Sequence, residues 1–332
     1  EMSRLAFRPA VAFAVVLLAA LLGLFMVALP DAPWQLGPFV RYEQNPILEP
    51  RGETWEAKDI FNPSVWTDGE TIWMLYRAED TTGRGAWNGT SRIGLATSRD
   101  GLHFQREPEP VLEPSEEWEI PGGVEDPRMV KVDDAFYLTY TAYDGKTARL
   151  ALATSKDLHH WKKHGLVFPE RGWTKAGAIL ATPIKGKYWM YFGDDDIRAA
   201  TSTDLIHWTV IEKPVLHRRA GTDKFDSRLV EPGPPPLLTE AGILLLYNGA
   251  NSQNVYASGQ ALFDRNDPTK LIARTDAPFF EPATEQEIEG QVPNVVFIEG
   301  LVQFQQQWFL YYGMADSGIG VAVHTPGGKD AR

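Results

Sequence analysis

The sequence has no cysteine among its 332 residues. Disulfide bonds and thiolate chemistry are therefore excluded, and redox chemistry gives no indication of the compartment. Apolar residues make up 43% of the chain. That is enough to bury a sizeable core in one large all-β domain or two smaller ones.

The chain also lacks an excess of positive charge. It has 32 Lys and Arg against 44 Asp and Glu, which gives a formal net charge of −12. A nucleic-acid-binding protein needs a basic face, so this balance argues against such a partner. Solubility alone is a sufficient reason for the negative charge.

Long apolar runs are absent after residue 30, but one precedes it. Ala10 to Leu29 carry no charge, and Arg4 and Arg8 stand before them. Twenty apolar residues in a helix can span a bilayer, and a basic N-terminal flank places the rest of the chain outside the cytoplasm. A cleaved signal peptide is the alternative. We expect a membrane anchor (or signal peptide) over 1–30, a linker over 31–40, and an extracytoplasmic domain.

From about residue 41 the sequence repeats. Five stretches align without gaps: each is apolar, has an aromatic residue at its fourth position, and has Asp or Asn at its eighth. They are Trp73–Asp80, Tyr137–Asp144, Trp189–Asp196, Leu244–Asn251 and Phe309–Asp316. This pattern is typical of a β-strand that runs into an acidic turn.

A second element follows three of these stretches. Ala-Thr-Ser-x-Asp ends at Asp100, Asp157 and Asp204, and a histidine follows three residues later each time. The element reads as a strand that enters an Asx-type turn. The histidines lie about fifty residues apart and share no ligand spacing, so we expect no metal site.

A third element precedes the aromatic strands and contains proline or polar groups, as in Phe61-Asn62-Pro63-Ser64 and Val230-Glu231-Pro232-Gly233. Repeats of this length with several short strands are typical of propeller blades. We therefore predict an all-β five-bladed β-propeller over 41–325, followed by a short tail over 326–332. A β-sandwich is the rival architecture, but it does not require five aligned copies.

One copy of the third element is chemically distinctive. In Gly122-Gly123-Val124-Glu125-Asp126-Pro127-Arg128, two adjacent carboxylates stand between a glycine pair and a proline. In a propeller the first strand of every blade lines the axis, so these acids would face a central pocket. An acidic turn paired with Arg128 is the structural alternative.

These residues carry a resemblance to glycoside hydrolase family 130. It rests on the run from Gly122 to Arg128 and three further stretches in matching order, and it covers about residues 43 to 323. The further stretches are Glu231–Pro236, Leu262–Pro268 and Gly290–Phe297. Family members are five-bladed propellers that cleave β-mannosides, some by phosphorolysis and others by hydrolysis.

The resemblance implies roles for individual residues. Asp126 matches the general acid, whereas Asn62, Arg77 and Asp316 match groups that hold the mannose being cleaved. Arg128 and Lys175 lie where cations would line the pocket, although neutralising nearby acids is an alternative for both. Tyr143, Asp144 and Glu287 complete the expected substrate-binding set.

We expect Glu231 to be the second catalytic carboxyl group, because glycoside cleavage usually uses two. Hydrolytic family members carry glutamate at this position, and export of the domain also favours hydrolysis. Pairing of Glu231 with Arg228 is the structural alternative, and Glu287 or Glu289 could share the base role.

The resulting hypothesis is an inverting β-mannosidase that acts on β-1,2-linked manno-oligosaccharides, without a cofactor. A β-mannoside phosphorylase that uses inorganic phosphate as co-substrate is the alternative. A glycan-binding propeller without chemistry is the second alternative, and it would not need Asp126 and Glu231 together. The oligomeric state is not predicted.

Overall fold

The computed structural model describes residues 34–82 and 89–327. The chain divides into two units, Glu1–Gln35 and Leu36–Arg332. All strands and the single helix of the described residues belong to the second unit. The prediction of an all-β fold is confirmed, since the helix α2 spans only Glu285–Ile288.

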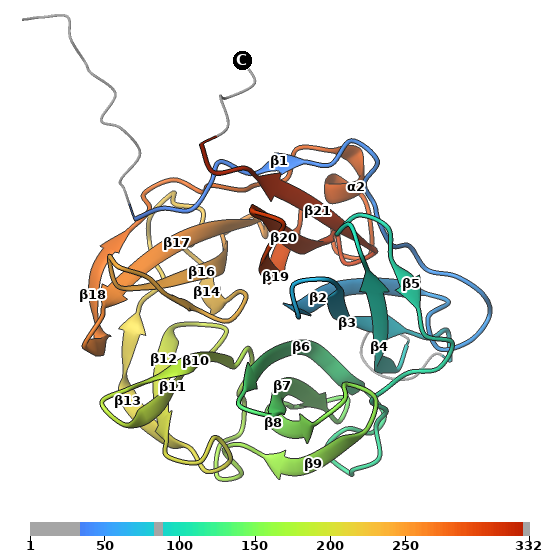
Figure 1. Cartoon of the computed structure of the whole chain (residues 1–332), viewed down its shortest axis with the longest axis horizontal. Coiled ribbons are helices and arrows are strands. Elements are labelled where there is room, and N and C mark those ends of the chain that lie inside the picture. Colours follow the sequence, from blue (N-terminus) through green and yellow to red (C-terminus); the bar gives the residue numbers. More distant parts are fainter. Residues whose placement is uncertain (1–33, 83–88, 328–332) are drawn as a thin grey trace, which may run out of the picture. The chain divides into compact units, whose positions relative to one another are not determined.

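The strands form five antiparallel meanders, numbered here in chain order, which are arranged around a common centre (Figure 1). The first contains β2 (Asp59–Thr67), β3 (Ile72–Glu79), β4 (Ser91–Ser98) and β5 (Gln105–Arg106). The second contains β6 (Gly123–Val132), β7 (Ala135–Tyr143), β8 (Ala148–Ser155) and β9 (Trp161–Leu166). The third contains β10 (Ala178–Ile184), β11 (Lys187–Phe192), β12 (Ile197–Ser202) and β13 (Thr209–Leu216). The fourth contains β14 (Leu229–Pro232), β15 (Leu237–Leu238), β16 (Ile243–Ala250), β17 (Tyr256–Asp264) and β18 (Asp267–Arg274).

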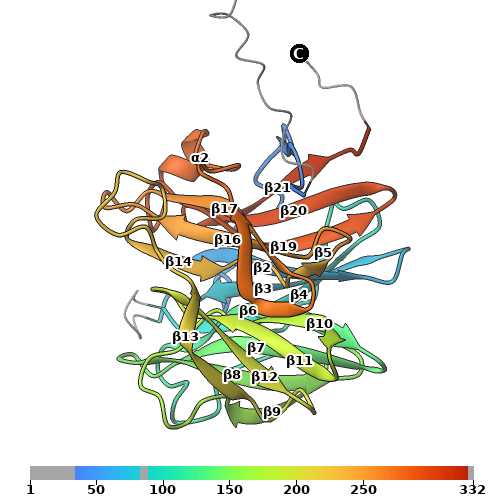
Figure 2. The same cartoon turned by 90° about the vertical axis from the view of Figure 1, so that its left-hand side faces the viewer.

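The fifth meander closes the ring. It contains β19 (Val296–Phe304), β20 (Gln307–Met314) and β21 (Gly318–His324), and its outer strand is β1 (Val40–Arg41) from the other end of the domain. Val40 pairs with Val323 in this antiparallel contact. Helix α2 contacts β20, and it lies at the same end of the domain as β20 and β21 in Figure 2. Segments from both ends of the domain therefore complete one sheet.

The first strands of the meanders lie at the centre of the ring. β2 contacts both β6 and β19, and β6 contacts β10. The five predicted aromatic strands are β3, β7, β11, β16 and β20, and each is the strand next to the central one. The repeat therefore predicted correctly which segments occupy equivalent places.

The shared aromatic residue of these strands has a structural partner in four meanders. The hydroxyl groups of Tyr76, Tyr140, Tyr247 and Tyr312 donate to Glu56, Glu119, Asp226 and Glu287. A basic side chain pairs with each of these acids, for example Arg41 with Glu287 at 2.7 Å. Phe192 replaces the tyrosine in the third meander. Buried polar groups need such partners, so the four pairs form part of the core.

The second repeated element also has a structural explanation. His103, His160 and His207 are exposed, and the ring of each bonds the aspartate three residues before it. The same aspartates accept backbone N–H bonds in the turn. Within residues 34–82 and 89–327, no group of His, Cys, Asp or Glu side chains is arranged to hold a metal ion.

The expected membrane helix over 10–29 lies outside the described residues and stays a prediction. Among the residues that are described, no helix has the length and apolar character needed to cross a bilayer.

Candidate active site

A cavity of about 280 Å³ lies where the five meanders meet, and every meander contributes to its lining. It brings together six of the predicted site residues: Asn62, Arg77, Asp126, Lys175, Glu231 and Asp316. The other lining residues are Phe61, Glu125, Arg228, Asn254, Tyr256, Gln291, Val292, Val295 and Phe297.

Local backbone irregularities direct two of these side chains toward the cavity. Asn62 and Asp126 both sit at β-bulges, where the register of β2 with β3 and of β6 with β7 shifts. Both have φ of 50°, a left-handed conformation that Asn and Asp adopt more readily than most residues. A proline follows each of them, and proline cannot donate to the ladder. A bulge followed by proline therefore re-aims these polar side chains.

Asp126 is the most heavily contacted carboxylate in the cavity. Asn62 Nδ2 donates to its Oδ1 at 2.9 Å, and Arg77 Nη1 donates to the same oxygen at 3.0 Å. Lys175 Nζ lies 3.3 Å from Oδ2. Burial alone would raise the pKa of Asp126, but the charges of Lys175 and Arg77 outweigh it and lower that pKa. In the free site Asp126 is a carboxylate.

Arg77 joins three acids. Its Nη2 lies 2.7 Å from Glu79 Oε1 and 3.1 Å from Glu125 Oε1, in addition to the contact with Asp126. Burial opposes the charge on Arg77, but these carboxylates raise its pKa well above the usual value. A guanidinium with several fixed partners is a rigid part of the site.

Three other lining carboxyl groups differ from Asp126. Burial raises the pKa of Glu125, Glu231 and Asp316 to about 7 each, and the nearby cations only partly offset it. One ionised acid thus stands among three acids that titrate near neutral pH. Environments that separate the pKa values of neighbouring carboxyl groups are characteristic of acid–base catalysis.

The comparisons with known proteins agree with this geometry. The model of a family described as β-1,4-mannooligosaccharide phosphorylase matches residues 38–326. The chain belongs to glycoside hydrolase family 130. The predicted family is therefore confirmed.

Two relatives come from Thermoanaerobacter sp. (strain X514). A 1,2-β-oligomannan phosphorylase is 38% identical over 289 residues, with 85% of this chain and 96% of the relative covered. A β-1,2-mannobiose phosphorylase is 38% identical over 298 residues with the same coverage. A solved structure is 42% identical with a TM-score of 0.86, over 91% of this chain and 97% of its own. The description of that structure states that this family of mannoside phosphorylases contains glycoside hydrolases that target β-1,2 mannosidic linkages in Candida mannan.

These relatives correct the main functional expectation. We expected a hydrolase and gave a phosphorylase as the alternative. The family is described as a phosphorylase, and both Thermoanaerobacter relatives are phosphorylases, so the alternative is better supported. The expectation rested on Glu231, whose carboxylate would repel phosphate. Because burial raises the pKa of Glu231 to about 7, that repulsion is incomplete at neutral pH.

We expected Arg128 to line the cavity, but it is not among the lining residues. Arg128 belongs to the central strand β6, and only 2% of it is exposed. Its Nε donates to the Gly233 carbonyl at 2.9 Å, and its Nη2 donates to the Pro232 carbonyl at 2.8 Å and pairs with Glu299 at 2.6 Å. Arg128 therefore ties the second, fourth and fifth meanders together.

Three more predicted substrate-binding residues are not among the lining residues. Asp144 accepts the backbone N–H groups of the turn that follows it, and Arg149 pairs with it at 2.9 Å. Tyr143 packs over Gly122, where a Cβ atom would lie 2.3 Å from its ring. Glu287 is fully buried between Arg41 and Tyr312. The alternative base Glu289 is exposed and also does not line the cavity.

Several lining residues were not predicted to bind substrate, because they belong to loops outside the repeated elements. Arg228 precedes β14, and its Nη2 donates to the Tyr256 hydroxyl at 2.9 Å. Asn254 has φ of 61° in the turn between β16 and β17. This turn is equivalent to the turn that carries Asp316, because both follow an aromatic strand. That equivalence was the signal that could have identified Asn254 from the sequence.

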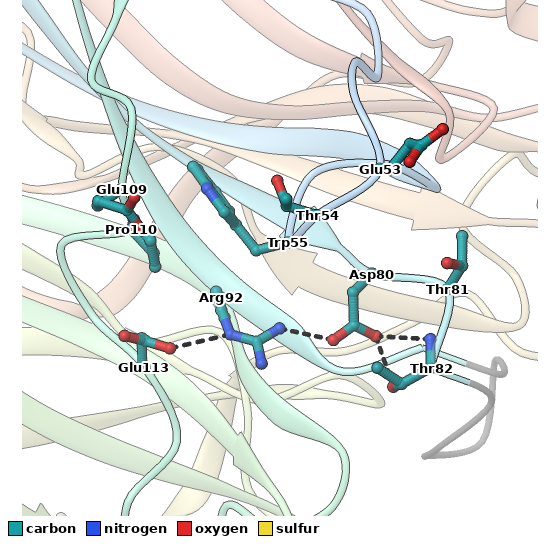
Figure 3. Close-up of a pocket in the computed structure, with 10 residues that line it drawn as sticks. All are labelled: Glu53, Thr54, Trp55, Asp80, Thr81, Thr82, Arg92, Glu109, Pro110 and Glu113. Atoms are coloured by element: carbon teal, nitrogen blue, oxygen red, sulfur yellow. Dashed lines mark hydrogen bonds and ion pairs between the residues drawn. The ribbon is translucent and has the colours of Figure 1, made fainter.

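A larger cavity, of about 500 Å³, lies on the first meander (Figure 3). Arg92 bridges Asp80 and Glu113 in it, at 2.7 and 3.1 Å, and Trp55 also belongs to its lining. It contains none of the predicted site residues, and the charges of its acids are only partly balanced by Arg92. The smaller cavity holds the acid–base chemistry and is the candidate active site.

Proposed function

We propose that this family 130 protein is an inverting β-mannoside phosphorylase that acts on β-1,2-linked manno-oligosaccharides. It would transfer the terminal mannosyl group to inorganic phosphate and release mannose 1-phosphate. The observation that carries this proposal is the contact of Lys175 with Asp126 inside a cavity that Arg77 and Arg228 also line. A phosphate dianion needs such cations close to the reacting carbon.

The five meanders are, on this proposal, the blades of a five-bladed propeller with the reaction at its axis. Asn62, Arg77 and Asp316 would hold the mannose, since all three line the cavity together with Asp126. Arg77 is fixed by three carboxylates, so it can position a sugar hydroxyl without reorganising.

Asp126 would act as the general acid after phosphate binds. In the free site Lys175 and Arg77 keep it ionised. A bound dianion beside Lys175 adds negative charge and offsets that effect, so the pKa of Asp126 rises and the carboxyl group takes a proton. The bond from C1 to the leaving oxygen breaks, a bond from C1 to a phosphate oxygen forms, and the proton passes to the leaving oxygen.

Glu231 would contact phosphate in its protonated form, as a hydrogen-bond donor. Its pKa of about 7 allows this form at neutral pH, whereas the carboxylate would repel the dianion. In this role Glu231 does not act as the base that would activate a water molecule.

Product analysis tests the proposal. The purified protein is incubated with β-1,2-mannobiose, with and without inorganic phosphate, and the products are separated by ion chromatography. We expect mannose 1-phosphate and mannose with phosphate, no turnover without it, and slower reaction with β-1,4-mannobiose. Release of mannose alone at equal rates in both buffers would refute phosphorolysis.

The proposed role of Glu231 predicts a pH effect. As pH rises through about 7, Glu231 loses its proton and repels phosphate, so the KM for phosphate should rise between pH 6.5 and 8.5. Glu231→Gln stays neutral and should keep a lower KM for phosphate at the upper end. Phosphate itself titrates equally for both enzymes, so the difference between their KM values for phosphate reports the titration of Glu231.

Glu240→Gln is the matched control, because Glu240 is an exposed glutamate of the same meander. It should follow the wild-type profile. A Glu231→Gln enzyme with the wild-type pH dependence, or with no turnover at any pH, would show that Glu231 does not act in this way.

A further inference from the structure

The turn between β11 and β12 lies on the same face as the active-site cavity. In the fourth and fifth meanders, the equivalent turns carry Asn254 and Asp316, which line the cavity. In the third meander this turn carries Asp194. The negative charge of Asp194 contributes to the pKa shifts of both Lys175 and Glu231, which agrees with a position close to both.

Trp173 is held at this turn. Its indole Nε1–H donates to Asp194 Oδ2 at 2.7 Å, and it stands two residues before Lys175 in the segment that enters β10. Trp173 is nevertheless 54% exposed. Among the large apolar side chains that are exposed within residues 34–82 and 89–327, it is the only aromatic one.

The backbone around Trp173 is fixed. Thr174 N donates to the Ala148 carbonyl at 3.0 Å, and its hydroxyl accepts from Leu150 N at 2.9 Å. Gly193 N donates to the Lys175 carbonyl at 2.9 Å, which joins this segment to the turn of Asp194. The indole ring is therefore presented to solvent in one orientation, at little further entropic cost on binding.

An exposed tryptophan with an anchored N–H group does not serve the core. Rigid aromatic rings with one polar handle are enriched at binding surfaces. The cavity of about 280 Å³ lies just below the usual range for small-molecule sites, so an oligosaccharide must extend over its rim. Trp173 is anchored to Asp194, whose negative charge acts on Lys175 of the cavity lining.

We propose that Trp173 is a stacking platform for a sugar ring of the substrate chain that lies outside the cavity. The inference rests on the proposed function, because it assumes a β-mannoside chain as substrate. Trp173 would then set a preference for chains of three or more units over the disaccharide.

The test measures kcat/KM for β-1,2-mannobiose, mannotriose and mannotetraose in wild type, Trp173→Ala and Trp173→Phe. We expect Trp173→Ala to lower kcat/KM for the tetraose by about tenfold, as for an aromatic hot spot worth more than 1 kcal/mol, and to change that for the disaccharide much less. Trp173→Phe should recover part of the difference. Ile272→Ala removes an equally exposed apolar side chain from β18 and should leave all three values unchanged.

Calorimetric binding of mannotetraose to the same proteins, without phosphate, separates this inference from the proposed function. If Trp173→Ala binds mannotetraose more weakly than wild type and Ile272→Ala does not, the role of Trp173 as a stacking platform is supported whatever reaction the enzyme catalyses. An equal loss for the disaccharide and the tetraose, or no loss of binding or kcat/KM in Trp173→Ala, would overturn it.

Discussion

Asp126→Asn is expected to reduce kcat by about 10²–10⁴-fold, the usual contribution of general acid catalysis. The amide cannot protonate the leaving oxygen, but its oxygen can still accept from Asn62 and Arg77, which bond Oδ1 at 2.9 and 3.0 Å. Asparagine also tolerates φ of 50° at this position. The fold should therefore be kept, which thermal unfolding monitors.

Asp133→Asn is the matched control for this variant. Asp133 has φ of 51° and lies at the opposite end of the same hairpin, where it is exposed. It should leave kcat unchanged. If Asp126→Asn keeps more than about a tenth of the wild-type kcat, a loss far below the usual range, Asp126 is not the general acid.

Lys175→Met is expected to lower kcat/KM for phosphate by about 10²–10³-fold, the effect of removing one stabilising donor from an active site. Lys175 combines a direct contact with Asp126, at 3.3 Å, with a position in the cavity lining. Without the charge of Lys175, phosphate loses a partner, and Asp126 loses the largest of the charges that lower its pKa. The measurement is initial rate against phosphate concentration.

Lys187→Met provides the control, because Lys187 is an exposed lysine of the same meander. Lys175→Arg should retain more activity than Lys175→Met, since the charge remains. A Lys175→Met enzyme whose loss appears only in KM for the mannoside would place Lys175 at the sugar and not at phosphate.

Much of the fold could be predicted because it repeats. The aromatic residue at the fourth position occupies the same place in every copy, and in four copies its hydroxyl meets a buried acid, as Tyr312 meets Glu287. The alignment of the first strands then predicted that Asn62, Asp126 and Glu231 converge, and all three line the cavity.

The misplaced residues are those whose direction depends on contacts between meanders. Arg128 lies two residues after Asp126, but the bulge turns it toward the carbonyl groups of Pro232 and Gly233. Glu287 bonds Arg41, which is 246 residues away in the sequence. Spacing along the chain contains no information on such contacts.

The choice between water and phosphate could not be predicted from Glu231 alone. A glutamate in the sequence suggests a carboxylate, whereas burial in the cavity raises the pKa of Glu231 to about 7 and permits a neutral acid. The expectation of hydrolysis also used export of the domain, which depends on residues 10–29 outside the described part of the chain.

The fate of the phosphate oxygens tests the central proposal most directly. The protein is incubated with β-1,2-mannobiose and inorganic phosphate that carries ¹⁸O on all its oxygens, and the products are analysed by mass spectrometry and ³¹P NMR. Phosphorolysis predicts mannose 1-phosphate that retains every ¹⁸O atom, with one of them bridging C1 and phosphorus. If mannobiose is consumed while all of the label stays in inorganic phosphate and only free mannose forms, the attacking group is water and the proposal is wrong.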